Sequence, residues 1–330
     1  MSATILNKKV GSIGFGLMGL TTRPKQISYD DAVKVMKRSL ELGANFWNAG
    51  EFYGPPDANS LQLLEYYFRK YPEDSKKVVL SVKGCFSLTR GPDNSPEGVR
   101  KSVENCLEKL QGRVPISIFE PARIDPQVPI EETIKALAEY VKEGKIGGIG
   151  LSECSVATIR GAHAVHPISV VEIEMSLFTP DALENGVATT CAELDIPIVA
   201  YSPLGWGFLT GQFKSLSDID EKDFRRAQPR FQPGAFEENL RIAEEVQKIS
   251  TSKGVTPAQT AIAWVKAQGQ KSNMPQVVPI PGCTTVARVE ENLKDVTLSE
   301  HELEDLNGLL QRNTVQGDRY GGMMAGLMNG

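Results

Sequence analysis

The sequence has few residues of the kinds that build disulfide frameworks and metal sites. Its five cysteines lie far apart and form no C-x-x-C pair, which favours reduced thiols in a cytoplasmic protein. Of only three histidines, His163 and His166 share one face of a predicted helix, but no further ligand with suitable spacing is nearby. We therefore expect packed or solvated histidines, no metal site and a cytoplasmic location.

Long apolar runs and basic stripes are also missing. No apolar stretch approaches the ~20 residues that a membrane span needs, and residues 1–11 lack the continuous apolar core of a signal peptide. Lysine and arginine total 36 against 41 aspartates and glutamates, so a net charge of -5 argues against a nucleic-acid partner. The 330 residues are 41% hydrophobic, which is ordinary globular composition with ample length for a large core and gives no sign of a membrane partner.

Short apolar segments alternate with amphipathic segments along the whole chain. Eight of the apolar segments are predicted to be strands, at 10–16, 45–48, 78–83, 116–120, 145–151, 169–174, 196–201 and 276–280. Capping signals predict helices that begin near residues 28, 95, 129, 179, 256 and 299, with the fourth running to about 194 and a further helix before 256. The strands are too apolar on both faces for an open antiparallel sheet.

This alternation is typical of a (β/α)8 (TIM) barrel, and we expect one such α/β domain over residues 1–330. A short strand and turn would precede the barrel, and an extra helix and a tail would follow it. The tail, residues 319–330, is rich in glycine and methionine, so we expect it to be mobile unless a partner orders it.

Three glycines near the start, Gly14, Gly16 and Gly19, match the G-x-G-x-x-G fingerprint of dinucleotide-binding folds. That fingerprint requires a helix that starts among the glycines and an acidic residue at the end of the next strand. Here residues 21–24 intervene, and the next strand ends in Asn48. We therefore reject the Rossmann interpretation and assign the glycines to a crowded strand and turn.

Polar side chains follow the predicted strands, at the end of a barrel where the chemistry of this fold is located. They are Asn48, Tyr53, Lys83, Ser152 and Tyr201, and Gly282 follows the last strand at the same end. A phenol can donate a proton, but its ordinary pKa is ~10. A neighbouring ammonium group favours the phenolate and makes the phenol a better acid, so Tyr53 and Lys83 form a candidate pair. Such residues at strand ends are more often merely amphipathic, and the order of elements around the pair is what favours function.

At this point the sequence resembles the aldo-keto reductases over nearly its whole length. The matching stretches are residues 46–54 (Phe-Trp-Asn-Ala-Gly-Glu-Phe-Tyr-Gly), 81–83, 150–152, 201–205, 280–282, and Arg288 with 291–292. Within that family, the residues around Tyr53 and residues 122–125 (Ala-Arg-Ile-Asp) are most similar to fungal pyridoxal reductases. The resemblance implies reduction of an aldehyde, first of all pyridoxal to pyridoxine, with NADPH as cofactor.

The resemblance also implies roles for individual residues. Tyr53 would protonate the carbonyl oxygen, with Lys83 tuning it and Asn48 beside the lysine. Cofactor contacts would come from Ser152, Glu172, Tyr201, Ser202, Leu204, Gly205, Gly282, Thr284, Arg288, Glu291 and Asn292. Aromatic and small residues near the mouth would form the substrate pocket, namely Trp47, Phe86, Ala122 and Trp206, with Phe52 close by.

Two positions depart from the family pattern. Most aldo-keto reductases have aspartate at the position of Asn48, and we expect the lost charge to lower the pKa values of Lys83 and Tyr53. Most also have histidine at the position of Ala122, which removes a donor to the substrate carbonyl and opens space. Glu120 shares a strand face with Ala122 and could reach a bound water, but we favour a role in the barrel floor. A substrate with its own polar group beside the aldehyde, as in pyridoxal, would suit this site.

Two alternatives remain open on the sequence. One is a reductase for another aryl or aliphatic aldehyde, because substrate loops are the variable part of this fold. The other is a slow-turnover sensor subunit that keeps NADPH bound, by analogy with potassium-channel β-subunits that resemble the family.

Overall fold

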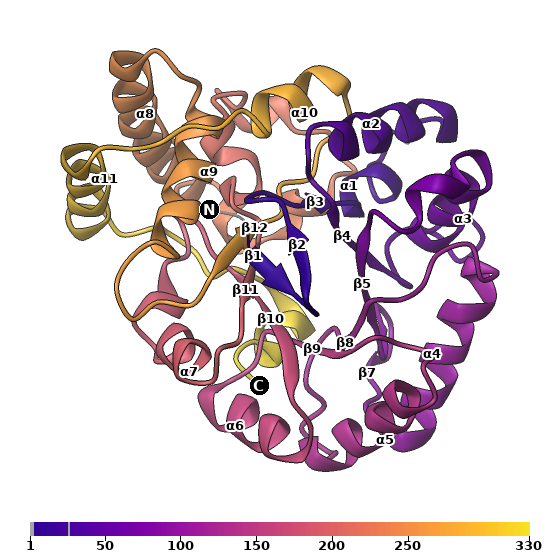
Figure 1. Ribbon diagram of the computed structural model, residues 1–330. Helices are drawn as coiled ribbons and strands as arrows, with labels where there is room; N and C mark the ends of the chain where they lie inside the picture. Colours follow the sequence, from indigo (N-terminus) through magenta and orange to yellow (C-terminus); the bar gives the residue numbers. More distant parts are fainter. Residues whose placement is uncertain (1–2, 26) are drawn as a thin grey trace.

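Eight parallel strands form the barrel around which the chain is built (Figure 1). The computed structural model describes residues 3–25 and 27–330, so Met1, Ser2 and Gln26 lie outside the described residues. Neighbouring strands follow one another in chain order, from β3 to β12. The barrel strands are β3 (Phe15–Gly16), β4 (Phe46–Gly50), β5 (Val79–Gly84), β8 (Ile118–Pro121), β9 (Ile149–Ser152), β10 (Ile168–Glu174), β11 (Ile198–Tyr201) and β12 (Val277–Pro279).

The barrel closes where β3 meets β12. The amide of Gly14 donates to the carbonyl of Pro279 at 2.9 Å, and that of Gly16 donates to Pro281 at 3.5 Å. A Cβ on Gly14 would lie 2.8 Å from the Phe46 carbonyl oxygen, and one on Gly16 would lie 2.9 Å from that of Ile280. The glycines therefore serve close strand packing. The rejection of the Rossmann interpretation is confirmed, since the helix that follows, α1 (Met18–Thr21), has only four residues.

The helices surround the barrel and begin close to the predicted caps. Ser28, Ser95, Thr256 and Ser299 each accept a hydrogen bond from the backbone amide three residues on. The longer helices are α2 (Tyr29–Glu41), α3 (Ser60–Lys70), α4 (Pro96–Leu110), α5 (Ile130–Lys142), α6 (Val156–Val165), α7 (Val187–Glu193), α8 (Ala235–Lys253), α9 (Pro257–Gln268), α10 (Val286–Asn292) and α11 (Glu300–Arg312).

Several predicted boundaries were wrong by a few residues. The strands predicted from 116, 145 and 196 begin at Ile118, Ile149 and Ile198, and the segment 10–16 is divided between the end of β2 (Lys8–Val10) and β3. The helix predicted from 179 to 194 is split into a 3-10 turn, η2 (Asp181–Leu183), and α7. Gly186, with a φ of 88°, ends the continuity because a left-handed residue cannot continue a right-handed helix.

An apolar cluster fills the amino-terminal half of the barrel interior. Six of the barrel strands (β4, β5, β8, β10, β11 and β12) contribute an inward-facing residue, and the hairpin of β1 (Ala3–Ile5) and β2 covers this end. The cluster consists of Ala3, Ile5, Val10, Phe46, Val79, Ile118, Val170, Val199, Val278 and Ile280. Because side chains alternate along a strand, the next inward positions are Asn48, Ser81, Glu120 and Glu172, all buried. An apolar floor therefore supports a polar layer at the level of the carboxyl ends.

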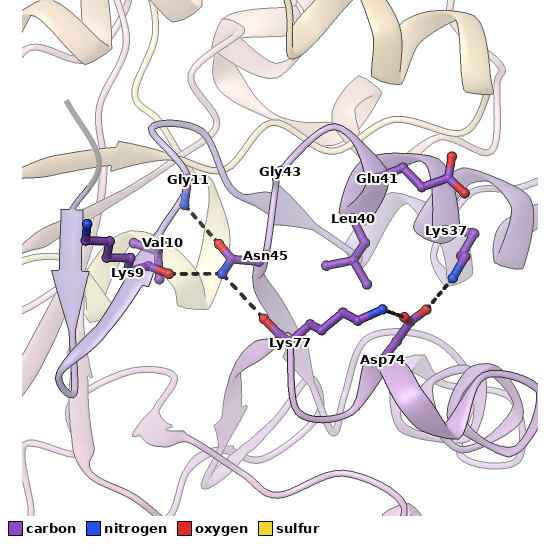
Figure 2. Close-up of a pocket in the computed structure, with 10 residues that line it drawn as sticks. All are labelled: Lys9, Val10, Gly11, Lys37, Leu40, Glu41, Gly43, Asn45, Asp74 and Lys77. Atoms are coloured by element: carbon purple, nitrogen blue, oxygen red, sulfur yellow. Dashed lines mark hydrogen bonds and ion pairs between the residues drawn. The ribbon is translucent and has the colours of Figure 1, made fainter.

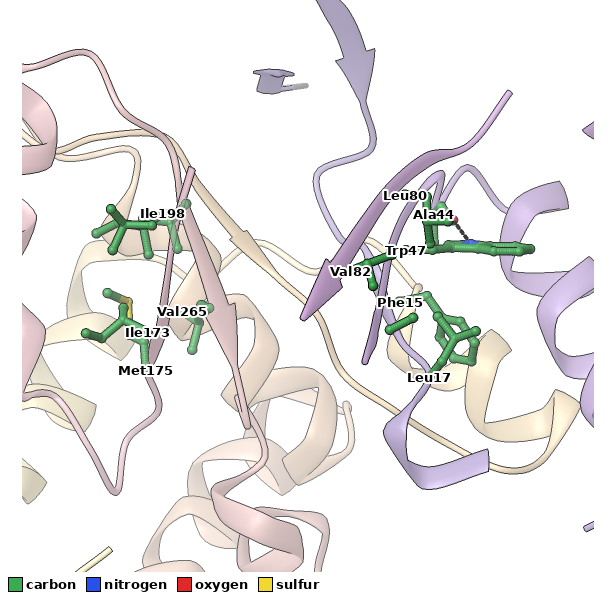
Figure 3. Packing of buried hydrophobic residues seen from close by; sticks show 14 of the residues in the cluster. Phe15, Leu17, Ala44, Trp47, Leu80, Val82, Ile173, Met175, Ile198 and Val265 are labelled. Carbon is green, nitrogen blue, oxygen red and sulfur yellow. Dashed lines mark hydrogen bonds between the residues drawn. The ribbon is translucent and has the colours of Figure 1, made fainter. Parts of the chain in front are cut away.

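Trp47 does not line a substrate pocket, contrary to the prediction. It is adjacent to Asn48 on β4, so its side chain points out of the barrel toward the helices. Its ring is fully buried 5.0 Å from that of Tyr67 and 5.9 Å from that of Phe68, both on α3. Figure 3 shows it in the outer apolar layer with Leu80 and Val82 of β5.

The amino-terminal end of the barrel carries a surface hollow of about 420 Å³ (Figure 2). Asp74 accepts from Lys37 at 2.7 Å and from Lys77 at 2.8 Å, and the Asn45 amide bridges Gly11 and Lys9. Its polar groups are thus occupied with each other, and it lies opposite the strand ends that carry the candidate site. We assign the hollow a structural role.

The tail is held by the barrel itself, contrary to the expectation of a mobile segment. Arg319 forms two hydrogen bonds with the Glu153 carboxylate, at 3.1 and 3.2 Å, and the Tyr320 hydroxyl lies 3.2 Å from that of Tyr201. Residues Gly322–Leu327 form the 3-10 segment η7. The tail therefore lies across the carboxyl-terminal mouth of the barrel. No helix in the described part of the chain is both long and apolar enough to cross a bilayer.

The buried position of Trp47 makes it a stability residue. We expect Trp47→Ala to lower the free energy of unfolding by about 3–5 kcal/mol, because it leaves a large cavity under α3. Urea unfolding of purified protein measures this change. Phe224→Ala is the control, since that ring is 44% exposed and its loss should change stability by about 0.5 kcal/mol or less. A stable Trp47→Ala protein with an altered KM would restore the pocket assignment.

Candidate active site

Lys83 is the centre of the polar layer. It leaves β5 toward the barrel axis, is 4% exposed, and forms an ion pair with Glu172 of β10. Its Nζ also donates to Oδ1 of Asn48 at 3.2 Å and lies 3.7 Å from Oε1 of Glu120. Glu120 and Lys83 are register partners on adjacent strands, so their side chains point to the same face. Two carboxylates therefore surround one buried ammonium group.

Asn48 connects these carboxylates to the lysine. Its Nδ2 donates to Oε2 of Glu172 at 2.6 Å and to Oε1 of Glu120 at 3.2 Å, while its Oδ1 accepts from Lys83. Only a carboxamide can accept from a cation and donate to two carboxylates at once. An aspartate at 48 would place a third acceptor against two carboxylates. The negative charge that the family pattern places at 48 is thus supplied here by Glu172 of β10.

Glu172 therefore supplies a negative charge beside Lys83, and the expected effect of asparagine in place of aspartate at 48 on the Lys83 pKa stays a prediction. Burial by itself would lower the pKa of Lys83, but Glu172, then Tyr53 and Glu120, raise it above its ordinary value. The pKa of Glu120 is raised well above its ordinary value, first by burial and then by the charge of Glu172. Lys83 is thus cationic. Within this cluster, burial favours the protonated form of Glu120.

Glu120 lies above the apolar floor of the barrel, in the polar layer, and not in the floor itself. Its Oε1 accepts from Ser81 at 3.1 Å and from Asn48, whereas its Oε2 is buried without a hydrogen-bond partner among the described residues. A Cβ on Gly150 would come within 3.0 Å of that Oε2. A carboxyl group so enclosed is an interior member of the cluster.

Tyr53 lies beside Lys83, as predicted. The Lys83 Nζ is 5.8 Å from the centre of the phenol ring, and Tyr53 is 8% exposed. The ring packs over Gly50, where a Cβ would come within 3.1 Å of it. The predicted pKa direction was wrong, however: burial raises the pKa of Tyr53 above its ordinary value, and the opposing charge of Lys83 only partly offsets this. The phenol is protonated at neutral pH.

The predicted pocket residues Phe86, Ala122 and Trp206 lie near this end of the barrel. Phe52 connects Phe86 to Tyr53, with ring centroids 5.1 and 5.0 Å apart, and Phe86 belongs to the hairpin of β6 (Phe86–Ser87) and β7 (Gly91–Pro92). Ala122 directly follows β8 and is buried. The Trp206 ring lies 4.8 Å from that of Tyr320 in the tail.

Two predicted cofactor residues flank the lysine cluster. The Tyr201 ring centre is 5.9 Å from the Lys83 Nζ. Ser152 ends β9 as the register partner of Glu172, and its hydroxyl is fully buried without a hydrogen-bond partner among the described residues. A buried, unsatisfied hydroxyl costs free energy unless a ligand completes it. Glu172, predicted as a cofactor contact, is instead engaged by Lys83 and Asn48, because β10 places it across the barrel axis from β4 and β5.

The remaining predicted cofactor residues form two loops at the same end of the barrel. After β11 the chain turns sharply, with Ser202 and Gly205 at φ values of 51° and 54° and a 3.0 Å hydrogen bond from Gly205 to Ser202. Gly282 follows β12, where a Cβ would lie 3.0 Å from the Gly16 carbonyl oxygen. Leu204 lies within the first turn, and Thr284 follows Gly282 in the second. Arg288, Glu291 and Asn292 lie on α10.

The sequence reasoning missed two groups of charged residues. Arg23 and Arg225 pair with Asp223 at 3.5 and 2.7 Å, and burial, then the charges of Arg225 and Arg288, lower the pKa of Arg23. Glu153 and Glu174, at the ends of β9 and β10, hold the tail. The signal available was their position directly after apolar strands. The described residues contain no cluster of three or more histidine, cysteine or acidic residues placed to hold a metal ion.

Comparison with known proteins identifies the family. The sequence profile of the Aldo/keto reductase family matches residues 12–311. The chain is 44% identical to the "Probable pyridoxal reductase 2" of Schizosaccharomyces pombe over 323 residues, 94% of this chain and 95% of that protein. It is 39% identical to the "Putative pyridoxal reductase" of Saccharomyces cerevisiae over 330 residues, 93% and 95% of the two chains.

A solved structure supports the fold assignment. The glycerol dehydrogenase of Gluconobacter oxydans superimposes with a TM-score of 0.81 and 20% sequence identity, covering 98% of each chain. Together with the profile match over most of the chain, this confirms the (β/α)8 barrel. The protein is a member of the aldo/keto reductase family.

Proposed function

We propose that this protein reduces an aldehyde with NADPH, and that pyridoxal is the preferred aldehyde. The observation that carries the proposal is a protonated, buried phenol, Tyr53, beside a lysine that Glu172 keeps cationic. The two fungal relatives whose names refer to pyridoxal reduction favour this substrate over other aldehydes. The proposed preference also suits the small residue Ala122, which leaves room for a ring substituent next to the carbonyl.

The residues present suit a nicotinamide dinucleotide. NADPH, when bound, supplies the hydride that reduces the carbonyl carbon. The orphaned Ser152 hydroxyl fits a carboxamide, Tyr201 offers a flat face for a planar ring, and the turn from Ser202 through Leu204 to Gly205 would hold the pyrophosphate. Gly282 and Thr284 to Asn292 would hold the adenosine end. Arg288, with Arg23 and Arg225 around the single carboxylate Asp223, suits the extra phosphate of NADP.

The proton that the carbonyl oxygen gains would come from a side chain of the protein. Tyr53 would donate its hydroxyl proton to the carbonyl oxygen as negative charge develops there. The phenolate that remains would be stabilised by the Lys83 ammonium group. This group stays protonated because it forms an ion pair with Glu172. Glu120, when protonated, leaves the cluster of Lys83 and Glu172 neutral overall, so the phenolate meets no excess negative charge. Asn48 fixes the mutual positions of these three side chains.

Removal of the Tyr53 hydroxyl tests the central role. We expect Tyr53→Phe to lower kcat for pyridoxal by about 10²–10⁴-fold, the usual contribution of a general acid, while NADPH still binds. Absorbance at the NADPH band measures turnover, and fluorescence titration measures cofactor binding. Tyr66→Phe, which changes a half-buried tyrosine on α3 that donates to Asp30, is the matched control. Equal activity of Tyr53→Phe and wild type would refute the role.

The same assay with a substrate panel tests the alternatives. Pyridoxal should have the highest kcat/KM among aryl and aliphatic aldehydes. Faster reduction of another aldehyde would identify a different substrate class. Tight NADPH binding with negligible turnover of every aldehyde would point to the sensor subunit instead.

The raised pKa of Glu120 predicts a pH-dependent stability. The folded protein keeps a proton on Glu120 that the unfolded chain releases near pH ~4.3, so raising the pH from there to the folded pKa favours unfolding. The stability of wild type relative to Glu120→Gln should therefore fall by up to ~1.4 kcal/mol per pH unit in that window. Urea unfolding of both proteins between pH 5 and 8 measures it. Glu97→Gln, an exposed change, should give a constant difference; a constant difference for Glu120→Gln would contradict the assignment.

A substitution of Arg288 tests whether this residue recognises the 2′-phosphate of NADPH. We expect Arg288→Ala to raise KM for NADPH by about tenfold or more and to leave KM for NADH within about twofold, since only NADPH has the 2′-phosphate. Initial rates with each cofactor measure this split. Arg312→Ala, at the end of α11, is the control. Equal effects on both cofactors would remove Arg288 from phosphate recognition.

A further inference from the structure

Arg123 is a buried cation next to the catalytic end of the barrel. It follows Ala122 at the end of β8, and it is 7% exposed. We propose that Arg123 binds an oxyanion that an aldehyde substrate carries beside its carbonyl group, and so selects for such substrates. This inference rests on the proposed reductase function and specifies which aldehydes it favours.

The guanidinium group has little to satisfy it. Its Nη1 donates to the carbonyl of Ala122 at 2.6 Å, while its Nε is buried without a hydrogen-bond partner among the described residues. No carboxylate of those residues lies within the 4.0 Å of an ion pair with it. Its other neighbour is the Tyr320 ring, whose centre is 5.6 Å from Cζ. A buried charge without a counter-ion is costly, so an anionic ligand would complete the site.

Among the described charged residues around the mouth, the arginines outnumber the carboxylates, and Arg123 is the arginine without an ion-pair partner. Arg319 pairs with Glu153 at 3.1 Å and lies 3.8 Å from Glu174, and Arg230 lies 3.7 Å from Glu174. Three buried or nearly buried arginines therefore face two carboxylates. Both carboxylates are committed to the arginines that hold the tail and the loop before α8. The excess positive charge is that of Arg123.

Arg123 is close to the groups assigned to the reaction. Tyr320, which lies against its guanidinium, touches the Tyr201 hydroxyl at 3.2 Å. Burial would lower the pKa of Arg123, but Tyr201, Tyr320, Glu153 and Tyr53 raise it above its ordinary value, so the cation is retained next to these phenols. The backbone is fixed, because the Asn94 side chain donates to the Arg123 carbonyl at 3.0 Å. Ala122, which precedes Arg123, has a small side chain and is buried.

The chemical class of the ligand follows from the guanidinium. A planar fork of N–H donors recognises a flat oxyanion such as a phenolate or carboxylate. An aldehyde on an electron-poor ring with an adjacent hydroxyl is such a group, because the carbonyl and a ring nitrogen both stabilise the ionised oxygen. Pyridoxal belongs to this class. Arg123 would orient the ring through that oxygen and leave the carbonyl to Tyr53.

Two matched aldehydes test the proposal. They are 3-hydroxypyridine-4-carbaldehyde and pyridine-4-carbaldehyde, which differ only in the hydroxyl group. We expect Arg123→Gln to lower kcat/KM for the hydroxy aldehyde by about tenfold or more and for the other by less than about threefold. Arg123→Lys, which keeps the charge but not the fork, should lie between Gln and wild type. Equal losses for both aldehydes would overturn the proposal.

The pH dependence of wild type and the Tm of Arg123→Gln complete the test, so the conclusion does not rest on one comparison of activities. The preference of wild type for the hydroxy aldehyde should vanish as the pH falls below the pKa of that hydroxyl; a preference that persists there would refute recognition of an anion. Arg123→Gln should have an unchanged or higher Tm, since it removes an unpaired buried charge. A lower Tm with equal losses would show a structural role.

The outcome also separates this inference from the proposed function. If wild type reduces pyridoxal but Arg123→Gln affects both aldehydes alike, the inference fails and the function stands. If wild type ignores pyridoxal yet prefers 2-carboxybenzaldehyde to benzaldehyde through Arg123, the inference stands and pyridoxal is the wrong substrate.

Discussion

One ion pair, between Lys83 and Glu172, sets the requirements for the rest of the site. An ammonium group inside a barrel is tolerated only with a close counter-charge and satisfied hydrogen bonds. Glu172 supplies the charge from the opposite side of the axis, and Asn48 links both partners. Once this pair is neutral, a second carboxyl group, that of Glu120, is accommodated in its protonated form. The surroundings of Lys83 are thus a closed electrostatic unit made from four strands.

The barrel architecture makes that unit possible. Below it, the apolar floor and the β1–β2 hairpin exclude water from the amino-terminal half. At the seam, Gly14 and Gly16 allow β3 to approach β12 closely enough to close the wall. Above it, the tail spans the mouth through Arg319 and Tyr320. The charges are therefore buried, and their interactions are stronger there than at a surface.

The site also explains a departure from the family pattern. An asparagine at position 48 is a poor counter-ion for lysine, but it is a good connector between a lysine and two carboxyl groups. The charge has moved from β4 to Glu172 of β10, so the lysine keeps its cationic form. A different layer, nearer the mouth, carries the surplus charge of Arg123. In the proposed function, the reaction and the choice of substrate would thus depend on separate sets of residues.

Much of this protein follows from the sequence by itself. The alternation of apolar and amphipathic segments determined the barrel, and caps such as Ser28 and Thr256 located helix starts, because these signals are local. The pairing of Tyr53 with Lys83 followed from two adjacent strands. Strand ends were less certain, since they depend on pairing with neighbours rather than on the segment itself.

Only the tertiary structure decided what depends on burial and on contacts across the axis. Glu172 reaches Lys83 from 89 residues away, and Arg319 reaches Glu153 from 166 residues away. No local pattern encodes such meetings. The direction of the Tyr53 pKa shift was decided in the same way, because desolvation by the whole barrel outweighs the charge of a single neighbour.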